Sequence, residues 1–588
     1  MKSTKSIYLN TCFRLFCGIS TVFALSGCGD FLETESKSTF TSDVVFSSTT
    51  YVNYAITGIY TAIPQNDVYM NFYFPFNTDI EYQNFSTGNT SDNERRSIGN
   101  YLINAGNQAL AGGGRPWGNY YKGIERANLC IKEIRNSSLL TEGTTSVQAL
   151  MKAYLGEALT LRAYLYTLLV INWGDIPFKT DPTQPDGSNF SNPKTDRDDI
   201  YDYLITDLQE AIELLPWLKD SETGTPERVS KGFAKGLLAR ICLYRGGYSF
   251  RTSMKMERGS NWQYYYGIAA QQCREIIDNG THRLNPSYAN IWKTLCKLDF
   301  DRTYNENLME IGFTMSYSGD NGYIAGWKYV TSDKYGYQTQ SGIMTTPAYL
   351  YSFHPKDSRR LVSVGVASYD ATPKQVIIQN PASLTIGKWN RKWMTDAYLT
   401  LMKSASGKIL TGVNWVPMRM ADVYLMLAEA DNALGQSMDE ARVALKTVRA
   451  RAFADADDLT KAAMVDAYVD GLAAGDDFFN AVVNERAWEF GGEAIRKYDL
   501  IRWNLLLDKI MEMRQNNLSI VNRTYPYDYI PNYLFYRYDD NDPEEIDYAT
   551  LNLDTDKGDS DISGFNRVPW YPMKAWTSTA TAQENYDG

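Results

Sequence analysis

The chain contains little histidine, and this argues against several kinds of catalytic and metal site. Its 588 residues include only two histidines, His282 and His354, which are far apart and lack the spacing of metal ligands. A Ser-His-Asp triad or a histidine-rich zinc site is therefore not expected. The sequence also has no phosphate-binding glycine loop, no cluster of metal-ligand residues and no nucleophile elbow. We therefore expect neither a cofactor nor a metal ion.

Cysteine is also scarce, and its spacing does not indicate a disulfide framework. There are seven cysteines, of which Cys12, Cys17 and Cys28 lie in or next to an N-terminal targeting segment. The others form no C-x-x-C pair and mostly lie in helical patterns, so we expect buried free thiols. These four are Cys130, Cys242, Cys273 and Cys296.

Long apolar runs are missing after the N-terminus, and the charge balance is acidic. No later stretch is apolar over the length needed to span a bilayer. With 58 basic and 69 acidic side chains, the formal net charge is −11. A chain of this charge is a poor candidate for binding phosphate backbones, so we expect no nucleic acid partner.

The first residues are typical of a targeting segment. Lys2, Lys5 and Arg14 accompany an apolar stretch, 15–25, that is too short for a stable membrane span. We therefore assign residues 1–27 to a signal peptide.

Cys28 follows this segment directly, and the small residues before it resemble the lipobox of bacterial lipoproteins. The resemblance implies cleavage before Cys28 and lipidation of its thiol and new amino group. The alternative is an ordinary signal peptide followed by a chance cysteine. Acidic residues just after the cysteine resemble the surface-export signal of Bacteroidetes lipoproteins: Asp30, Glu33 and Glu35.

The most recognisable stretch, residues 156–177, has the period of an amphipathic helix with one broad buried face. Gly174 and Pro177 end this helix, because glycine permits a left-handed turn and proline cannot continue the helix. Similar periodicity predicts further helices, two of them preceded by capping residues, Asp196 or Asp198 and Ser230. The expected helices cover residues 51–61, 115–135, 196–215, 230–246 and 265–279.

Two segments lack this periodicity. Residues 65–114 are rich in Asn, Gly, Tyr and Phe, and we expect a long loop-rich insert there. Residues 281–415 carry short β-like stretches at 308–313 and 375–378 between glycine- and aromatic-rich loops, which predicts an irregular insertion. Helices are then expected at 419–434, 439–452 and 480–506, followed by a loop-rich tail over 507–588.

Two carboxylates in the C-terminal region could in principle act as an acid/base pair. Glu485 and Glu489 lie one helical turn apart, near Arg486, Arg496 and Arg502. Glycosidic hydrolysis needs two carboxylates at a defined separation across the substrate. The alternative is that these carboxylates pair with arginines where helices pack, and we favour it because ion-pair networks of this kind are often structural.

Aromatic residues give the better indication of function. The chain has 43 Tyr and 13 Trp, many of them in loops. Sugar rings present C–H faces that stack on aromatic rings, while polar side chains bind the hydroxyls. Residues 71–101 and 317–337 combine both kinds of side chain, although core packing is the alternative for any single ring. The candidate ligand-binding residues are Tyr82, Asn84, Arg95, Tyr101, Tyr323, Trp327 and Tyr329.

Four segments in the expected order resemble the SusD/RagB family of surface lipoproteins. They begin with Glu157-Ala158 and Leu161-Arg162-Ala163-Tyr164 through Gly174-Asp175-Ile176-Pro177, and the resemblance runs from Cys28 to about Trp503. Val568-Pro569-Trp570-Tyr571-Pro572 matches the family's closing segment only loosely. The other matching segments are Arg419-Met420-Ala421-Asp422-Val423-Tyr424-Leu425-Met426-Leu427-Ala428-Glu429-Ala430, Val448-Arg449-Ala450-Arg451-Ala452, and Glu485-Arg486 with Asp499-Leu500-Ile501-Arg502-Trp503.

This resemblance implies a mainly α fold, a tetratricopeptide-like scaffold of helical pairs with large irregular loop-rich insertions and a few short strands. It implies an N-terminal helical region over 28–280 and a C-terminal region over 281–588. It also implies a non-catalytic outer-membrane lipoprotein, anchored through its lipid and facing the cell surface. Such a protein captures oligosaccharide or polysaccharide and delivers it to a SusC-like TonB-dependent transporter.

Three other functions stay open at this point. The same scaffold could capture peptides, as some members of the family do. It could be an all-α glycoside hydrolase that uses the glutamate pair, or a helical adaptor that binds only the transporter.

Overall fold

The computed structural model describes most of the chain after residue 40. Cys28, Asn84 and Arg95, together with the predicted signal peptide, lie outside the described residues. The described ranges are 41–63, 75–83, 97–99, 101–104, 106–107, 116–404, 407–555 and 562–570.

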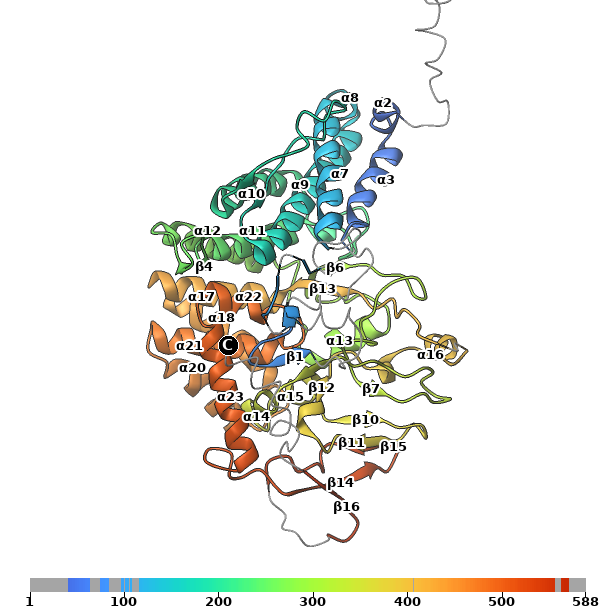
Figure 1. The fold of residues 1–588 in the computed structure, drawn as a ribbon, viewed down its shortest axis with the longest axis vertical. Coiled ribbons are helices and arrows are strands. Elements are labelled where there is room, and N and C mark those ends of the chain that lie inside the picture. The colour runs from blue at the N-terminus through green and yellow to red at the C-terminus, as the bar shows by residue number, and fades with distance from the viewer. Residues whose placement is uncertain are drawn as a thin grey trace, which may run out of the picture.

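The fold is mainly α, as predicted, and its helices pack in sequence order. In the N-terminal half, α7 packs on α9, α9 on α10, α10 on α11 and α11 on α12, which then contacts α17 of the C-terminal half. Figure 1 shows the resulting stack of helical layers, blue to green above orange. The N-terminal helices are α2 (Ser42–Val45), α3 (Thr49–Tyr60), α7 (Pro116–Asn136), α8 (Ser138–Thr141), α9 (Thr145–Trp173), α10 (Arg197–Leu214), the short η1 (Leu218–Asp220), α11 (Lys231–Arg245) and α12 (Trp262–Asn279).

The C-terminal helices differ from the prediction in two places. The expected helix over 480–506 is broken at Gly491 and Gly492, and Gly492 has a φ of +83°, a conformation that favours glycine. The tail, predicted to be loop-rich, contains the 17-residue helix α23. The elements are α17 (Met420–Leu434), α18 (Met438–Ala452), α19 (Asp458–Lys461), the π-helical turn η4 (Ala462–Ala467), α20 (Tyr468–Asp470), α21 (Asp476–Phe490), α22 (Arg496–Arg502) and α23 (Leu506–Asn522).

The tail also forms a small antiparallel sheet in the order β15-β14-β16. Its strands are β14 (Tyr533–Asp539), β15 (Asp542–Asp547) and β16 (Asn566–Pro569). Figure 1 shows this sheet at the end of the molecule opposite the N-terminal helices. The prediction of a loop-rich tail over 507–588 therefore missed α23 and this sheet.

Helix α9 is the central member of the N-terminal stack. Its Arg162 donates to Asp207 of α10 through Nε at 2.9 Å and to Asn128 of α7 through Nη1 at 2.9 Å. All three side chains are buried, so one guanidinium ties three helices together. The helix ends at Gly174, whose φ is +76°. The two short strands β2 (Ile176–Pro177) and β3 (Lys194–Thr195) then lead into α10.

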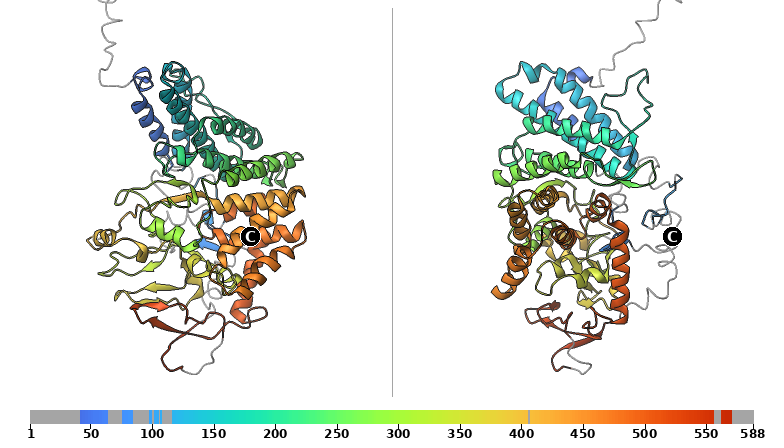
Figure 2. Two further views of the ribbon diagram at one scale, coloured as in Figure 1. Left: turned by 180° about the vertical axis from the view of Figure 1, so that it is seen from behind. Right: turned by 90° about the vertical axis from the view of Figure 1, so that its left-hand side faces the viewer.

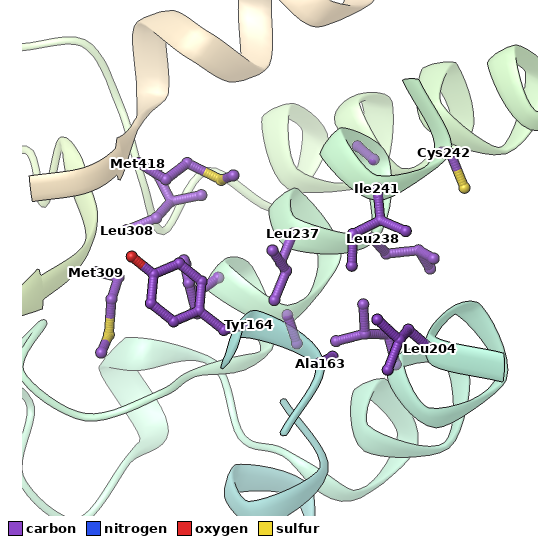
Figure 3. Close-up of a cluster of buried hydrophobic side chains, with 14 of the residues drawn as sticks. Ala163, Tyr164, Leu204, Leu237, Leu238, Ile241, Cys242, Leu308, Met309 and Met418 are labelled. Atoms are coloured by element: carbon purple, nitrogen blue, oxygen red, sulfur yellow. The ribbon is translucent and has the colours of Figure 1, made fainter. Parts of the chain in front are cut away.

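The helical core continues into the C-terminal half through one two-stranded sheet. Figure 3 shows Leu308 of β6 (Asn307–Ile311) and Met418 of β13 (Trp415–Arg419) beside Leu237 of α11. The approach is close, since a Cβ on Gly236 would lie 2.3 Å from the Met418 sulfur. A larger residue at position 236 would therefore displace the Met418 side chain.

The insertion over 281–415 is irregular, as predicted, and lies beside the C-terminal helices (Figure 2). Its main sheet has the order β1-β8-β12-β9, and β1 (Glu81–Gln83) comes from the earlier loop-rich insert. A second sheet has the order β11-β10-β7. The insertion contains α13 (Tyr288–Cys296), β7 (Lys328–Tyr329), β8 (Ile343–Thr345), α14 (Pro347–Ser352), α15 (Arg360–Ser363), β9 (Val364–Gly365), β10 (Ala367–Tyr369), β11 (Gln375–Ile377), η2 (Pro381–Ser383), β12 (Thr385–Ile386), η3 (Arg391–Trp393) and α16 (Asp396–Lys403).

The predicted states of two other features are confirmed. The four cysteines of the body are buried free thiols. Asp196 caps α10, because its side chain accepts a hydrogen bond from the Asp198 backbone at 2.8 Å. Ser230 precedes α11 as predicted, but its side chain makes no capping hydrogen bond.

No helix in the described ranges combines the length and the apolar character needed to cross a membrane.

Candidate functional site

The two segments predicted to bind ligand meet at one sheet, although they are more than 200 residues apart in the sequence. Tyr82 of β1 pairs with Met344 of β8. The preceding residue of β8, Ile343, forms a bridge to Ala325, two residues beyond Tyr323. In Figure 1 the blue β1 accordingly lies against the yellow-green insertion. We use the name loop face for the partly or largely exposed tyrosines of these two segments, Tyr82, Tyr101, Tyr317 and Tyr323.

Tyr101 lies on the part of the early insert that contacts the C-terminal helices. Its ring is 41% exposed, its hydroxyl donates to the Asn77 carbonyl at 2.5 Å, and Lys497 Nζ lies 4.6 Å from the ring centroid. The backbone at Tyr101 has a φ of 60°, which is uncommon for a non-glycine residue. Ile98, three residues before Tyr101, belongs to the same buried hydrophobic cluster as Ile324 of the insertion. This cluster attaches the segment to the core of the insertion.

Tyr82 and Tyr323 are both partly exposed. The Tyr82 hydroxyl donates to the Ala382 carbonyl, so its ring is held against the sheet. Over the ring of Tyr323, Lys408 Nζ lies 4.8 Å from the centroid and forms an ion pair with Asp320 at 2.6 Å. An aromatic face beside a cation and a carboxylate is suited to stack on a sugar ring and to bind its hydroxyls.

Trp327 and Tyr329 do not lie on this face, which corrects the prediction for both. Trp327 is 5% exposed, and its Nε1 donates to the Gly387 carbonyl at 3.0 Å. Tyr329 is 1% exposed and stacks on Tyr369 with ring centroids 4.6 Å apart and planes inclined by 3°. Its hydroxyl donates to Asn390. Both rings are part of the core of the insertion.

Tyr317 is a candidate that the sequence analysis did not select, although it begins one of the two aromatic segments. It is 81% exposed, on a turn in which its backbone N–H donates to the Thr314 carbonyl at 3.0 Å. Gly319 then takes a φ of +87° and brings the chain back to the core. The flanking Ser316, Ser318 and Gly319 are turn-forming residues, and this pattern could have identified Tyr317 as exposed.

A cavity of about 100 Å³ lies where the insertion meets the N-terminal helices. Phe313, Trp415 and Tyr498 line it, together with Ile63 and Pro75. Sites for drug-sized ligands typically measure roughly 300–1,000 Å³. The cavity is therefore too small for an oligosaccharide.

The glutamate pair is part of a buried network of arginines. Glu485 accepts from Arg359 and Arg449, each at 2.7 Å. Glu489 accepts from Arg359 at 2.9 Å, from Arg419 at 2.5 Å and from Arg451. Burial raises the pKa of Glu489, but the three arginines outweigh it and hold that pKa well below its usual range. Both carboxylates are fully buried, which supports the structural interpretation over the catalytic one.

Other buried charges have similar roles in the packing. Glu157 accepts from Arg228 at 2.7 Å and from the Tyr60 hydroxyl at 2.5 Å. Glu429 binds Arg502 through both carboxylate oxygens. Among the described residues, no group of three or more possible metal ligands comes together.

Comparisons with known proteins agree with this architecture. The model of the SusD family matches residues 252–542, and a model described as starch-binding and associating with the outer membrane matches residues 30–243. SusD-like protein P25 of Formosa agariphila is 25% identical over 533 residues, which cover 84% of this chain and 90% of the relative.

Solved structures give the same result for the fold. A SusD homolog from Bacteroides thetaiotaomicron has a TM-score of 0.68 at 22% identity, covering 82% of this chain and 91% of that one. Surface glycan-binding protein A from the same species, in complex with laminarihexaose, has a TM-score of 0.58 at 18% identity and covers 78% and 91%. A laminarin-binding SusD-like protein has a TM-score of 0.58 at 20% identity and covers 79% and 93%.

The fold thus defines a stack of helical pairs that carries an irregular insertion on one side. The chain belongs to the SusD/RagB family. Neither family model describes an enzyme.

Proposed function

We propose that the protein is a non-catalytic glycan-binding lipoprotein of the cell surface, which captures oligosaccharides on its loop face. The observation that carries this proposal is the meeting of the two aromatic segments at one sheet, with Tyr101 and Tyr317 exposed. Laminarin-binding and laminarihexaose-bound relatives with the same fold support the choice of a glycan as ligand.

The binding chemistry follows from the side chains of the loop face. Tyr101, Tyr317 and Tyr323 offer ring faces for stacking on the C–H faces of sugars, while Lys408, held by the buried Asp320, offers hydrogen-bond donors. Several shallow contacts of this kind bind a polymer through avidity even where each contact is weak. Asn84 and Arg95 stay predicted ligand contacts.

The remaining parts of the proposal concern location and delivery. Cys28 would be lipidated and would anchor the protein in the outer membrane, and the captured glycan would pass to a SusC-like TonB-dependent transporter. The second family model, which is described as associating with the outer membrane, supports the location. Acyl chains on the mature protein are expected in its mass spectrum, and a Cys28→Ser variant is expected to be released as a soluble protein.

Titration calorimetry on the chain without residues 1–27 tests glycan binding. The first probes are laminarin, laminarihexaose and starch, followed by a wider panel of polysaccharides. We expect heat of binding with at least one glycan and its loss in a Tyr101→Ala/Tyr317→Ala double variant. Tyr54→Ala is the matched control, because Tyr54 is an exposed tyrosine on α3, which packs with α7 and α9 in the N-terminal stack.

Absence of binding to every glycan would contradict the proposal. Binding of peptides instead would favour the peptide-capturing alternative. Binding of the transporter without any small ligand would favour the adaptor.

A further inference from the structure

A second hollow lies where the ends of four helices meet. The C-terminal end of α9, the N-terminal end of α10, the C-terminal end of α11 and helix α22 surround it. The hairpin of β4 (Ser249–Phe250) and β5 (Met256–Glu257) forms part of its rim. Its volume is about 270 Å³, and none of the ligand-binding residues predicted from the sequence lines it. We call it the helix-end cleft.

The walls of the helix-end cleft are largely aromatic. The rings of Tyr201 and Tyr244 lie nearly parallel, with centroids 6.5 Å apart and planes inclined by 23°. Phe250 is half exposed on the hairpin. Ring faces of this kind can cover the C–H face of a sugar. The aromatic lining consists of Trp173, Tyr201, Tyr244, Tyr248, Phe250 and Tyr498.

The backbone holds this lining in place. A Cβ on Gly247 would lie 2.9 Å from Arg502 Cβ and 2.8 Å from the Leu243 carbonyl, so only glycine lets α11 end this close to α22. The next residue, Tyr248, donates its backbone N–H to the Arg502 carbonyl at 2.8 Å. Tyr248 is therefore held in place where α11 and α22 meet.

Two hydroxyl groups of the cleft have no partner within the described part of the chain. Tyr201 is 4% exposed and Tyr244 is partly buried, and neither hydroxyl makes a hydrogen bond to another described residue. Both hydroxyls can therefore bond to a ligand without first breaking a hydrogen bond within the protein. A ligand that brings hydroxyls of its own would satisfy them, whereas a purely apolar ligand would not.

Arg197 adds hydrogen-bond donors at the edge of the cleft. Its Nε donates to Asp175 at 2.9 Å, and its two Nη groups make no further hydrogen bond to the described residues. Nη2 lies over Gly174, where a Cβ would come within 2.3 Å of it. Because Asp175 balances the charge of Arg197, the donors are available without an excess of positive charge.

We propose that the helix-end cleft is a second binding site, for a single neutral sugar ring. The volume of about 270 Å³ suits one ring, the aromatic walls suit the C–H faces of the ring, and the unpaired hydroxyls with Arg197 suit its hydroxyl groups. The choice of a sugar as ligand rests on the proposed function, whereas the cleft and its chemistry do not. The site would hold a terminal sugar unit or a free monosaccharide.

Saturation-transfer difference NMR on the mature chain tests this assignment with glucose, galactose and mannose as probes. Glucuronic and galacturonic acids are measured in the same way, to compare acidic sugars with neutral ones. We expect transfer from at least one neutral sugar, and about a threefold to tenfold weaker affinity on each of Tyr201→Phe and Tyr244→Phe, since each removes one hydrogen bond. These variants keep the rings and the fold, and Ser249→Trp is expected to abolish binding by filling the rim.

The control for these variants is Tyr264→Phe, an exposed tyrosine on α12 that lines neither site. Retention of the monosaccharide signal in Tyr101→Ala/Tyr317→Ala and its loss in Ser249→Trp would support the assignment. The opposite pattern would place the monosaccharide on the loop face and overturn it. Absence of any monosaccharide signal, or binding of the acids alone, would also overturn it. Failure of the proposed function is a separate result, because it shows as absence of oligosaccharide binding in the calorimeter.

Discussion

Buried polar groups are paired differently in the helical scaffold and in the loop-rich half, by which we mean the early insert over 65–114 and the insertion over 281–415. In the helices, buried carboxylates such as Glu489 and Asp422 are each paired with two or more arginines. In the loop-rich half, polar atoms of Asn77, Glu81 and Thr345 are buried without a hydrogen-bond partner among the described residues. Satisfied networks favour one rigid arrangement, and unsatisfied groups cost stability. Asp431 of α17 and Arg451 of α18 also keep one atom each unpaired among the described residues, so the contrast lies in multiply paired carboxylates such as Glu489 and Asp422, which lie in the helices.

The largest effect is expected from breaking the paired network. Glu489→Ala would leave Arg359, Arg419 and Arg451 buried with fewer partners, and the loss of one partner of a buried pair typically costs about 3–5 kcal/mol. Chemical denaturation followed by circular dichroism measures this cost. The matched control is Glu440→Gln, whose pair with Arg274 is largely exposed and is expected to be worth less than about 1 kcal/mol. Equal losses for the two variants would contradict the comparison.

Trp327, in the core of the insertion, tests whether a buried side chain there stabilises the fold as much as one in the helices. Trp327→Ala removes a buried ring and its hydrogen bond to Gly387, and such truncations cost about 3–5 kcal/mol. We expect a lower melting temperature, with glycan affinity retained by the fraction that stays folded. A variant that folds with unchanged stability but loses glycan binding would show that Trp327 contacts ligand after all.

Glu81 makes the stability of the loop-rich half depend on pH. Burial raises its pKa from 4.5 to about 8, against the lowering effects of the Gly492 N–H, Lys388 and Arg496. The folded state therefore holds a proton that the unfolded chain has lost between pH 4.5 and 8, so stability falls as pH rises through this window. This loss of stability amounts to a few kcal/mol. Glu81→Gln is expected to make the free energy of unfolding less dependent on pH in the same window. Unfolding titrations at several pH values provide the test, and an unchanged slope in the variant would refute the assignment to Glu81.

The smallest effect on stability is expected on the loop face itself. Tyr317→Ala should change the free energy of unfolding by less than about 0.5 kcal/mol, because its ring is exposed. The same change should weaken glycan binding, which separates it from Trp327→Ala. Denaturation and calorimetry on one preparation give both numbers. A large loss of stability would mean that Tyr317 supports the fold.

Much of the scaffold could be predicted because helical periodicity is local. The existence of α9 and its end at Gly174 follow from residue spacing, and so does the cap at Asp196. The prediction of a single buried face was wrong, because every residue from Tyr154 to Thr167 is buried. The break at Gly491 was missed because the apolar pattern resumes at Ile495 and Leu500. Helix α23 was missed because its apolar residues lie on both faces. Leu507, Met511 and Leu518 are exposed, while Ile510, Met513 and Ile520 are buried.

The site could be predicted only as a pair of segments. Which rings face outward depends on contacts with distant parts of the chain, and no local period encodes them. Tyr329 is buried because Tyr369 stacks on it from a strand 40 residues later in the sequence. Tyr317 is exposed because a tight turn lifts it from the surface. The environment of the paired charges was easier to predict, because Glu485 and Glu489 lie among arginines as expected.

Hydrogen exchange on the mature chain, with and without the glycan that binds best in the calorimeter, tests the central claim most directly. Ligand contact protects backbone amides that it orders or covers. We predict the largest added protection in peptides from 97–107 and 313–323, with little change in α7, α10 and the other N-terminal helices. Protection confined to those helices, with none on the loop face, would contradict the account.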